Sequence, residues 1–354
     1  MKISFVINEP IQSASGGYKM VYIYANELVE KEHDVTIYYH CHRDVLFSNY
    51  KLPFWTKMTI ANVLSKTGPK WFELDKRVGR KVIRNVTDKN VADGDIVIAT
   101  AANTADDVYK LSETKGKKFY FIQGYEDWIM SADELARTYG YPMTKITVSS
   151  WLKNVVEKYT EDPIYCVLNG IRNDVFFVSV QPSERTVRQI SMLYHNLESK
   201  GSKEGLSVIY KLKKEFPDLQ AHLFGIVDKP ENLPDWIKYT QNASQKELNN
   251  IYNASQIYLC PSWNEGFGLT GAESMMCGCV LVTTKTKGSL EYADDTNAML
   301  VEIHDTNQMY DACKNILENG SLRIEIAEKG AADVSSLLNY KNSVDRMISI
   351  LTEK

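Results

Sequence analysis

The sequence has no run of 18 consecutive apolar residues, so it predicts no membrane-spanning helix. Its six cysteines form no CxxC pair and no zinc-like grouping with the six histidines, and we expect them to be buried free thiols. The formal net charge of -4 argues against a nucleic-acid-binding protein. Met1 and Lys2 lead directly into a strand-like run without signal-peptide character, so we expect a cytoplasmic location.

Short β-rich runs alternate with helical segments along the whole chain, which is typical of parallel sheets covered by helices on both faces. A length of 354 residues exceeds what one core usually supports, so two domains are expected. We therefore predict an α/β protein of two Rossmann-like, doubly wound domains that face each other across a cleft. The predicted boundaries are 1–178 for the first domain, 179–335 for the second and 336–354 for a last helix. The polar stretch 173–188 is the predicted linker.

The predicted strands are residues 2–8, 34–39, 95–100, 118–123, 146–149 and 164–168 in the first half, and residues 189–194, 220–224, 256–260, 280–284 and 299–303 in the second.

The segment from Trp263 to Cys277 carries the clearest functional pattern. It reads as strand, glycine turn and helix, and it sets Glu265 and Glu273 eight positions apart around that turn. Small residues let backbone N–H groups approach a phosphate, and the helix start adds partial positive charge. The two carboxylates are then suited to neutral hydroxyls, such as those of a sugar and a ribose. The pattern predicts a site for a sugar nucleotide.

The same letters fit a rival hypothesis, because Gly266, Gly268 and Gly271 match GxGxxG and Glu291 lies 20 residues beyond the last glycine. A dinucleotide fingerprint should begin directly at the end of the first strand, whereas here four residues intervene and several strands come earlier. A purely structural glycine turn is the other alternative.

Two further elements are compatible with phosphate binding. Gly16 and Gly17 stand at a predicted helix start, where free amides could hold an anion or where Ser15 could simply cap a tight turn. Lys200 follows a predicted strand and could neutralise a leaving diphosphate, the alternative being a solvated loop lysine. The Asp93-Gly94-Asp95 triplet precedes its strand, so we interpret it as a turn and predict no bound metal.

Residues 51–84 hold nine basic residues interleaved with aromatic ones. Such a segment suits an anionic membrane surface, and a solvated helix face is the equal alternative. A peripheral contact at the inner face of a membrane therefore stays open.

With these positions in hand, the chain resembles a retaining glycosyltransferase of the GT-B fold, of the family 4 (group 1) type that builds bacterial polysaccharides and glycoconjugates. The specific part is the segment PSWNEGFGLTGAESMMCG, which contains Glu265 and Glu273. The resemblance implies a hexosyl- or deoxyhexosyltransferase with a nucleotide-sugar donor on the C-terminal domain and a glycan, lipid-linked or protein-linked acceptor on the N-terminal domain. It implies no cofactor and no metal, and a last helix that crosses back to the N-terminal domain.

The resemblance also implies a role for each site residue. Glu265 and Lys200 would be catalytic, with Glu265 on the donor sugar hydroxyls and Lys200 on the diphosphate. The implied donor-binding residues, which include the ribose ligand Glu273, are Gly16, Gly17, His195, Asn196, Phe267, Gly268, Leu269 and Glu273.

The chain departs from the family pattern at two places. His195 and Asn196 stand where an arginine is usual before the lysine, and Gln123 to Glu126 stand where many members have a histidine. Gln123 and Glu126 are therefore the acceptor-side candidates, and their Gln-x-Tyr-Glu pattern resembles rhamnose-transferring members. The departures support an alternative function, a catalytically silent GT-B subunit that binds a nucleotide and partners an active glycosyltransferase. A sugar-nucleotide epimerase is a third option.

Overall fold

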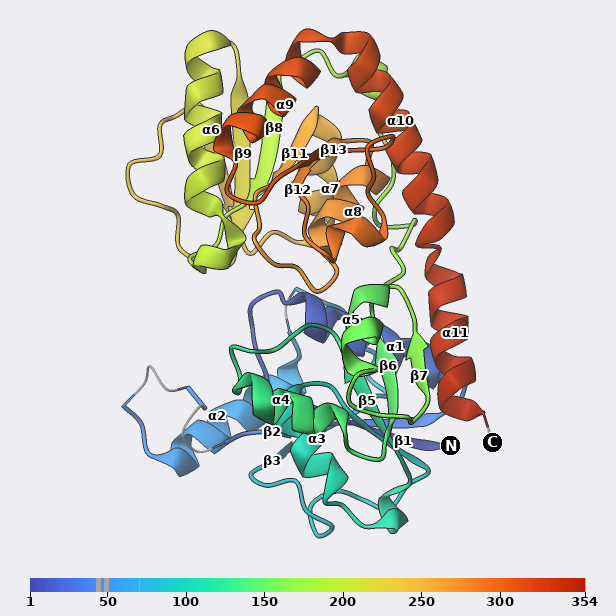
Figure 1. Ribbon diagram of the computed structural model, residues 1–354. Helices are drawn as coiled ribbons and strands as arrows, with labels where there is room; N and C mark the ends of the chain where they lie inside the picture. The colour runs from blue at the N-terminus through green and yellow to red at the C-terminus, as the bar shows by residue number, and fades with distance from the viewer. Residues whose placement is uncertain (43–45, 48–50, 70, 354) are drawn as a thin grey trace. The chain divides into compact units, whose positions relative to one another are not determined.

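The structure of the chain is a computed structural model that describes residues 1–42, 46–47, 51–69 and 71–353. The chain divides into two compact units (Figure 1): an N-terminal unit of residues 1–168 and 344–354, and a C-terminal unit of residues 169–343. Each unit is a parallel sheet with helices packed on it, which confirms the predicted α/β class with two doubly wound domains.

The N-terminal unit contains a seven-stranded parallel sheet in the order β3-β2-β1-β4-β5-β6-β7. Its strands are β1 (Lys2–Asn8), β2 (Asp34–His40), β3 (Gly79–Ile83), β4 (Ile96–Ala99), β5 (Lys117–Ile122), β6 (Thr144–Thr147) and β7 (Ile164–Cys166). Its helices are α1 (Gly16–Glu30), α2 (Phe54–Thr67), α3 (Ala102–Tyr109), α4 (Ala132–Tyr139) and α5 (Ser150–Val156), with the 3-10 turn η1 (Glu113–Lys115). All four residues of the inner strand β4 are buried and apolar, as expected where helices cover both faces of a parallel sheet.

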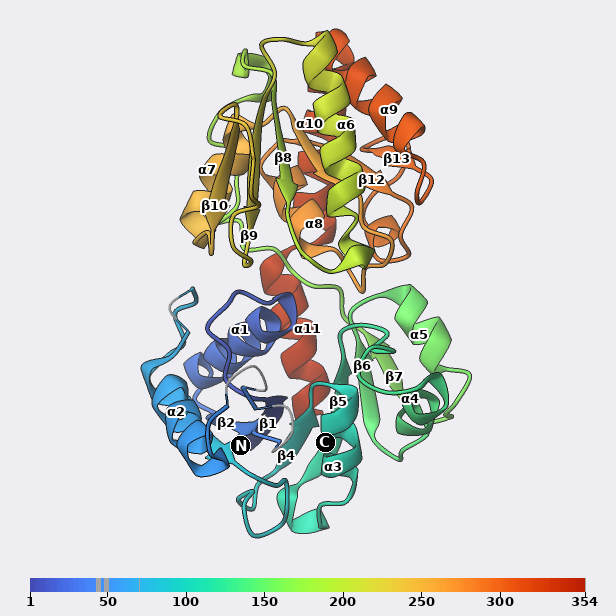
Figure 2. The ribbon, with the colours of Figure 1, turned by 90° about the vertical axis from the view of Figure 1, so that its left-hand side faces the viewer.

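The C-terminal unit contains a six-stranded parallel sheet in the order β10-β9-β8-β11-β12-β13. Its strands are β8 (Gln189–Leu193), β9 (Gln220–Gly225), β10 (Ile237–Gln241), β11 (Ile257–Cys260), β12 (Val280–Thr284) and β13 (Met299–Val301). Its helices are α6 (Ser202–Glu215), α7 (Gln245–Ala254), α8 (Leu269–Met276), α9 (Thr306–Glu318) and α10 (Gly320–Leu337), and α11 (Tyr340–Thr352) begins in it; the 3-10 turns are η2 (Pro182–Glu184), η3 (Glu198–Lys200) and η4 (Ser289–Glu291). Helices α6 and α9 lie side by side over the sheet (Figure 2) and close its main core.

The strand order reverses once in each sheet, and these reversals locate the candidate sites. The order changes direction between β1 and β4 in the N-terminal unit and between β8 and β11 in the C-terminal unit. Open α/β sheets bind ligands at the carboxyl ends of the strands that flank such a reversal, because the connecting helices there diverge to opposite faces. Lys200 follows β8, and Glu265 follows β11.

The structure corrects the first predicted domain boundary from 178/179 to 168/169. The predicted linker 173–188 is not a free linker, because its backbone is held by the C-terminal unit. The side-chain oxygen of Asn253 accepts hydrogen bonds from the backbone N–H groups of Ser179 (2.7 Å) and Val180 (3.1 Å). Arg185 is buried and donates to the carbonyl oxygens of Ser255 and Gly278, both at 2.7 Å.

The second boundary also moves, from 335/336 to 343/344. Residues 336–337 complete α10, and the N–H of Ile171 donates to the carbonyl oxygen of Leu338 at 2.9 Å, which ties this end to the C-terminal unit. The last helix is α11, and it belongs to the N-terminal unit from Val344 onward. There Asp345 forms an ion pair with Lys31 at 3.1 Å.

The sequence pattern missed two strands, β3 and β10. Both are the outermost strands of their sheets, and each buries only one of its five residues. An edge strand with one covered side does not need the continuous apolar run by which the inner strands were recognised.

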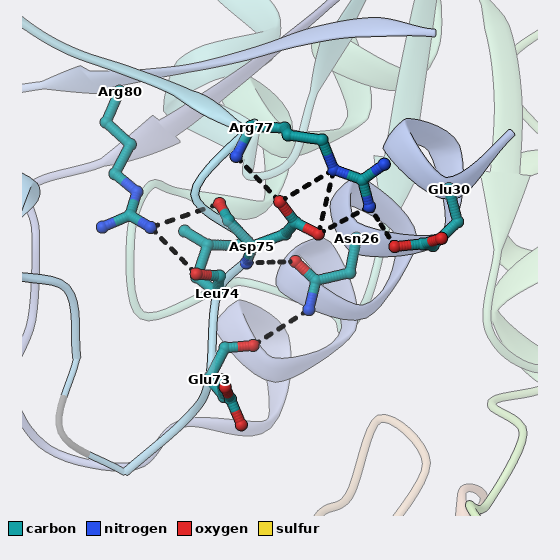
Figure 3. A network of polar contacts seen from close by, with 7 residues as sticks. All are labelled: Asn26, Glu30, Glu73, Leu74, Asp75, Arg77 and Arg80. Carbon is teal, nitrogen blue, oxygen red and sulfur yellow. Dashed lines mark hydrogen bonds and ion pairs between the residues drawn. The ribbon is translucent and has the colours of Figure 1, made fainter. Parts of the chain in front are cut away.

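Within the described residues, the basic segment 51–84 contains α2 and β3, so only part of it is helical. Figure 3 shows that two of its arginines form polar contacts with other residues of the N-terminal unit. Arg77 pairs with Asp75 at 2.8 Å and with Glu30, and Arg80 donates to the carbonyl oxygen of Leu74 at 3.0 Å. Lys70 lies outside the described residues. Within the described ranges, no helix is both long and apolar enough to cross a bilayer.

Candidate functional site

Lys200 and Glu265, predicted from separate motifs, form an ion pair in the C-terminal unit. The Nζ atom of Lys200 lies 2.7 Å from Oε1 of Glu265, and their side chains are 25% and 13% exposed. Burial by itself would lower the pKa of Lys200, but the charge of Glu265 and its hydrogen bond outweigh that effect and raise the pKa above its usual value. Lys200 is therefore a stable cation at the carboxyl edge of the sheet.

Close backbone contacts hold the two loops that carry this pair. Gly201 has a φ of +62°, and a Cβ atom there would lie 2.0 Å from the carbonyl oxygen of Pro261, so only glycine fits. Beside it, the N–H of Trp263 donates to the carbonyl oxygen of Ser199 at 2.7 Å. The loop after β8 and the loop after β11 are thus joined directly before the two charged residues.

The glycine turn predicted from the sequence begins α8. Gly268 is the N-cap residue, with a φ of +84° that favours glycine. Its carbonyl oxygen accepts a hydrogen bond from the hydroxyl of Tyr292 at 2.7 Å, and Phe267 is buried against the Tyr292 ring with centroids 5.5 Å apart. Leu269 opens the helix, and the N-cap Gly268 has no side chain that could cap its first amides, which suits an anion site.

Glu273 lies within α8 and is only 3% exposed. Burial first, and then the charge of Glu273, raise the pKa of the neighbouring Tyr252. The second carboxylate of the motif is therefore buried inside the C-terminal unit, whereas Glu265 is partly exposed.

His195 lies beside Lys200. Its Nδ1 atom accepts a hydrogen bond from the N–H of Leu197 at 2.9 Å, which leaves the proton of the neutral ring on Nε2. Burial, and then the charge of Lys200, lower the pKa of His195. A neutral His195 does not replace the arginine that the family usually has here. The neighbouring Asn196 is exposed.

The N-terminal unit gathers the acceptor-side candidates and the other glycine pair near its own strand reversal. Gly16 and Gly17 begin α1, and the side chain of the N-cap residue Ser15 makes no capping hydrogen bond. A Cβ atom on Gly17 would lie 3.4 Å from the amide nitrogen of Gln123. The start of α1 therefore keeps its free amides beside a polar side chain.

Glu126 lies between β5 and α4 in the same unit, and its side chain reaches the first residue of α3. Its Oε2 atom accepts a hydrogen bond from the N–H of Ala102 at 2.6 Å. Burial raises the pKa of Glu126 to about 7, although the N–H of Ala102 acts in the opposite direction. The carboxyl group can therefore change its charge near neutral pH.

The Asp93-Gly94-Asp95 triplet forms internal contacts, as expected for a turn. Asp95 accepts a hydrogen bond from the N–H of Lys2 at 2.6 Å, and Asp93 pairs with Lys115 at 2.6 Å.

Sequence reasoning missed the residues that support the site from outside the motif. One of them is Tyr292, which holds Gly268 and Phe267. It belongs to no recognisable motif, and the sequence offers no pattern that would have marked it as a site residue. Neither His304 nor Glu204 belongs to the motifs singled out in the sequence. In the structure these two contact each other, with Nδ1 of His304 2.9 Å from Oε1 of Glu204.

Residues 179–333 match the family model described as glycosyl transferases group 1. A D-inositol 3-phosphate glycosyltransferase from Saccharomonospora viridis is 25% identical over 122 residues, which is 34% of this chain and 28% of that protein. The chain therefore spans less than a third of the length of this curated relative.

Two solved structures resemble the whole chain. Sucrose-phosphate synthase from Thermosynechococcus elongatus superposes with a TM-score of 0.76 at 13% identity, covering 99% of this chain and 98% of that one. Alr3699/HepE from Anabaena, in complex with UDP and glucose, superposes with a TM-score of 0.75 at 12% identity and covers all of both chains. At these identities the two likenesses show the fold alone.

Proposed function

We propose that this chain, which has a GT-B fold and carries a group 1 glycosyl transferase domain at residues 179–333, transfers a sugar from a nucleotide-sugar donor to an acceptor hydroxyl. One observation carries the proposal. The Lys200–Glu265 ion pair stands at the strand reversal of the C-terminal unit, a few residues before the glycine turn that opens α8. Cation, carboxylate and helix amides are the groups that a diphosphate and a sugar need side by side.

The donor diphosphate would lie on the amides of Phe267, Gly268 and Leu269 and on Lys200. A lysine has three N–H donors, so Lys200 can contact a phosphate oxygen while it stays bonded to Glu265. Without that bond, the carboxylate would repel the diphosphate. Glu265 would accept hydrogen bonds from the sugar hydroxyls, and the buried Glu273 from the ribose.

We propose that the reaction proceeds with retention of configuration. The bond between the anomeric carbon and the phosphate oxygen breaks, and its electron pair goes to the leaving diphosphate. The acceptor oxygen bonds to the anomeric carbon on the same face, and its proton passes to the leaving phosphate oxygen. The amides of α8 and Lys200 would stabilise the negative charge that develops, which is usually the largest catalytic contribution.

The acceptor is proposed to bind to the N-terminal unit, with Gln123 and Glu126 as hydrogen-bonding groups. Glu126 has one oxygen on the N–H of Ala102, so its other oxygen can meet an acceptor hydroxyl. The Anabaena protein was solved with UDP and glucose, which supports a uridine sugar nucleotide as the first donor to test.

The test is release of nucleoside diphosphate from UDP-, GDP- and dTDP-sugars by the purified chain, with and without EDTA. Slow release without acceptor, insensitive to EDTA, is the expected result for an enzyme whose diphosphate charge is met by Lys200 and backbone amides. Tight nucleotide binding with no turnover would favour the silent partner subunit. An isomerised donor would identify an epimerase.

Glu126→Gln should stabilise the protein at alkaline pH. The carboxyl group has an ordinary pKa of 4.5 and a folded pKa of about 7. Because the folded value is higher, the carboxyl favours the folded state at low pH, and that contribution is lost as the pH rises through 7. Relative to wild type, the variant should gain up to about 3 kcal/mol between pH 5 and pH 8. Urea unfolding at both pH values measures it, and an equal difference at the two values would contradict the assignment.

A membrane contact is proposed through α2 and not through the whole basic segment. Trp55 and Val63 of α2 are 72% and 53% exposed, whereas Arg77 is held by Asp75 and Glu30. A variant with Trp55→Ser and Val63→Ser should lose co-sedimentation with vesicles of anionic lipid. Arg77→Gln is the control and should bind normally. Equal sedimentation of wild type and the α2 variant would refute the contact.

A further inference from the structure

Three side chains that the proposed reaction does not use form a cluster in the C-terminal unit. The indole N–H of Trp263 donates to Oε2 of Glu204 at 3.1 Å, and Nδ1 of His304 lies 2.9 Å from Oε1 of the same carboxylate. The rings of Trp263 and His304 stack edge to face, with centroids 4.4 Å apart. Glu204 therefore binds one partner with each oxygen.

The three residues come from three separate segments at the carboxyl edge of the sheet. Glu204 lies in the first turn of α6, just after Lys200, Trp263 follows β11, and His304 lies between β13 and α9. Glu204 thus lies in α6 and His304 just before α9, and these two helices run side by side (Figure 2). His304 has a φ of +69°, a backbone conformation that non-glycine residues rarely adopt, so its position is held by its surroundings.

Trp263 connects this cluster to the catalytic pair. The backbone N–H of Trp263 donates to the carbonyl oxygen of Ser199, the residue before Lys200, at 2.7 Å. Along the chain it comes two residues before Glu265. A shift of the indole would therefore move both loops that set the distance between Lys200 and Glu265.

We propose that Glu204 is a positioning residue, which fixes the Trp263 indole against His304 and thereby holds Lys200 and Glu265 in their reactive arrangement. The inference rests on the proposed glycosyl transfer. Glu204 touches neither donor nor acceptor in this scheme. Its loss should therefore act on turnover, because a displacement of about 1 Å at a catalytic group costs on the order of a hundredfold in rate. The amides of α8 and the buried Glu273, which bind the donor, stay in place.

The test compares four variants with wild type in donor turnover and donor binding. Glu204→Ala should lower kcat by about 10- to 100-fold and change the donor KM less than about threefold. Glu204→Gln keeps an oxygen for the indole and should recover most of the activity. Trp263→Phe keeps a ring against His304 but loses the N–H, and it should repeat the loss of Glu204→Ala.

Glu215→Ala is the matched control, because Glu215 lies at the other end of α6 and pairs with Lys314 and Tyr310. It should lose stability in thermal unfolding and keep its kcat. If Glu204→Ala kept wild-type kcat, or lost kcat only in proportion to a general loss of folded protein, the positioning role would be wrong. If wild type itself released no nucleoside diphosphate, the proposed function would fail instead. In that case the contact can be tested by fluorescence, with the signal of Trp263 taken as the difference between a protein and its Trp263→Phe variant. The same difference with and without Glu204→Ala would refute the contact.

Discussion

Glu265→Gln is expected to lower kcat by several hundred-fold while the protein stays folded. The carboxylate is 13% exposed and stands at the edge of the sheet, where positive charge would grow on the donor sugar. Removing one preorganised group that meets transition-state charge costs about 2.7 to 4 kcal/mol. Glutamine has nearly the same shape and removes only the charge.

Release of nucleoside diphosphate at saturating donor measures this effect. Glu302→Gln is the control, because Glu302 is an exposed glutamate of the same unit that pairs with Lys285. The control should retain wild-type turnover. Normal kcat in Glu265→Gln would remove Glu265 from the mechanism and with it the assignment of the site.

Lys200→Met is expected to lower kcat/KM by roughly 10- to 150-fold, since a hydrogen bond to a charged group contributes about 1.5 to 3 kcal/mol. Methionine keeps the length and apolar stem of lysine, but it leaves the carboxylate of Glu265 without its cation. Both kcat and the donor KM should change, because Lys200 would contact the diphosphate before and during bond breaking.

A double-mutant cycle tests whether the two residues act as a unit. Their side chains touch at 2.7 Å, so the losses in Glu265→Gln and Lys200→Met should not add in the double variant. Because the pKa of Lys200 is raised, its charge should persist through the neutral range, and activity should show no loss from its titration there. Additive losses would mean that the ion pair has no role in turnover.

The positions of the inner strands along the chain followed from the sequence alone. The predicted ranges 2–8 and 280–284 coincide with β1 and β12, because these runs are apolar, rich in β-branched residues and bounded by polar turns. The edge strands β3 and β10 escaped this reasoning, since half-exposed positions carry no continuous apolar signal. The domain boundaries were also displaced, because Asn253 and Arg185 fasten the presumed linker through contacts that no local pattern encodes.

For the candidate site too, the sequence identified individual residues but not the contacts between them. Each of Lys200, Glu265 and Gly268 was selected by its place after a strand or in a turn. The contacts between site residues could not be predicted from the sequence, because the partners are far apart along the chain. Lys200 and Glu265 are separated by 65 positions, and Glu204 and His304 by 100.

The sequence by itself determined the alternation of strands and helices, the glycine turn at Gly268 and the chemical character of the residues around it. These features depend on side-chain periodicity and backbone freedom over a few neighbouring residues. Only the tertiary structure decided which strands became neighbours, that Lys200 would meet Glu265, and that Arg77 would pair with Glu30. Those outcomes depend on contacts between distant segments, which form only when helices cover both faces of each sheet.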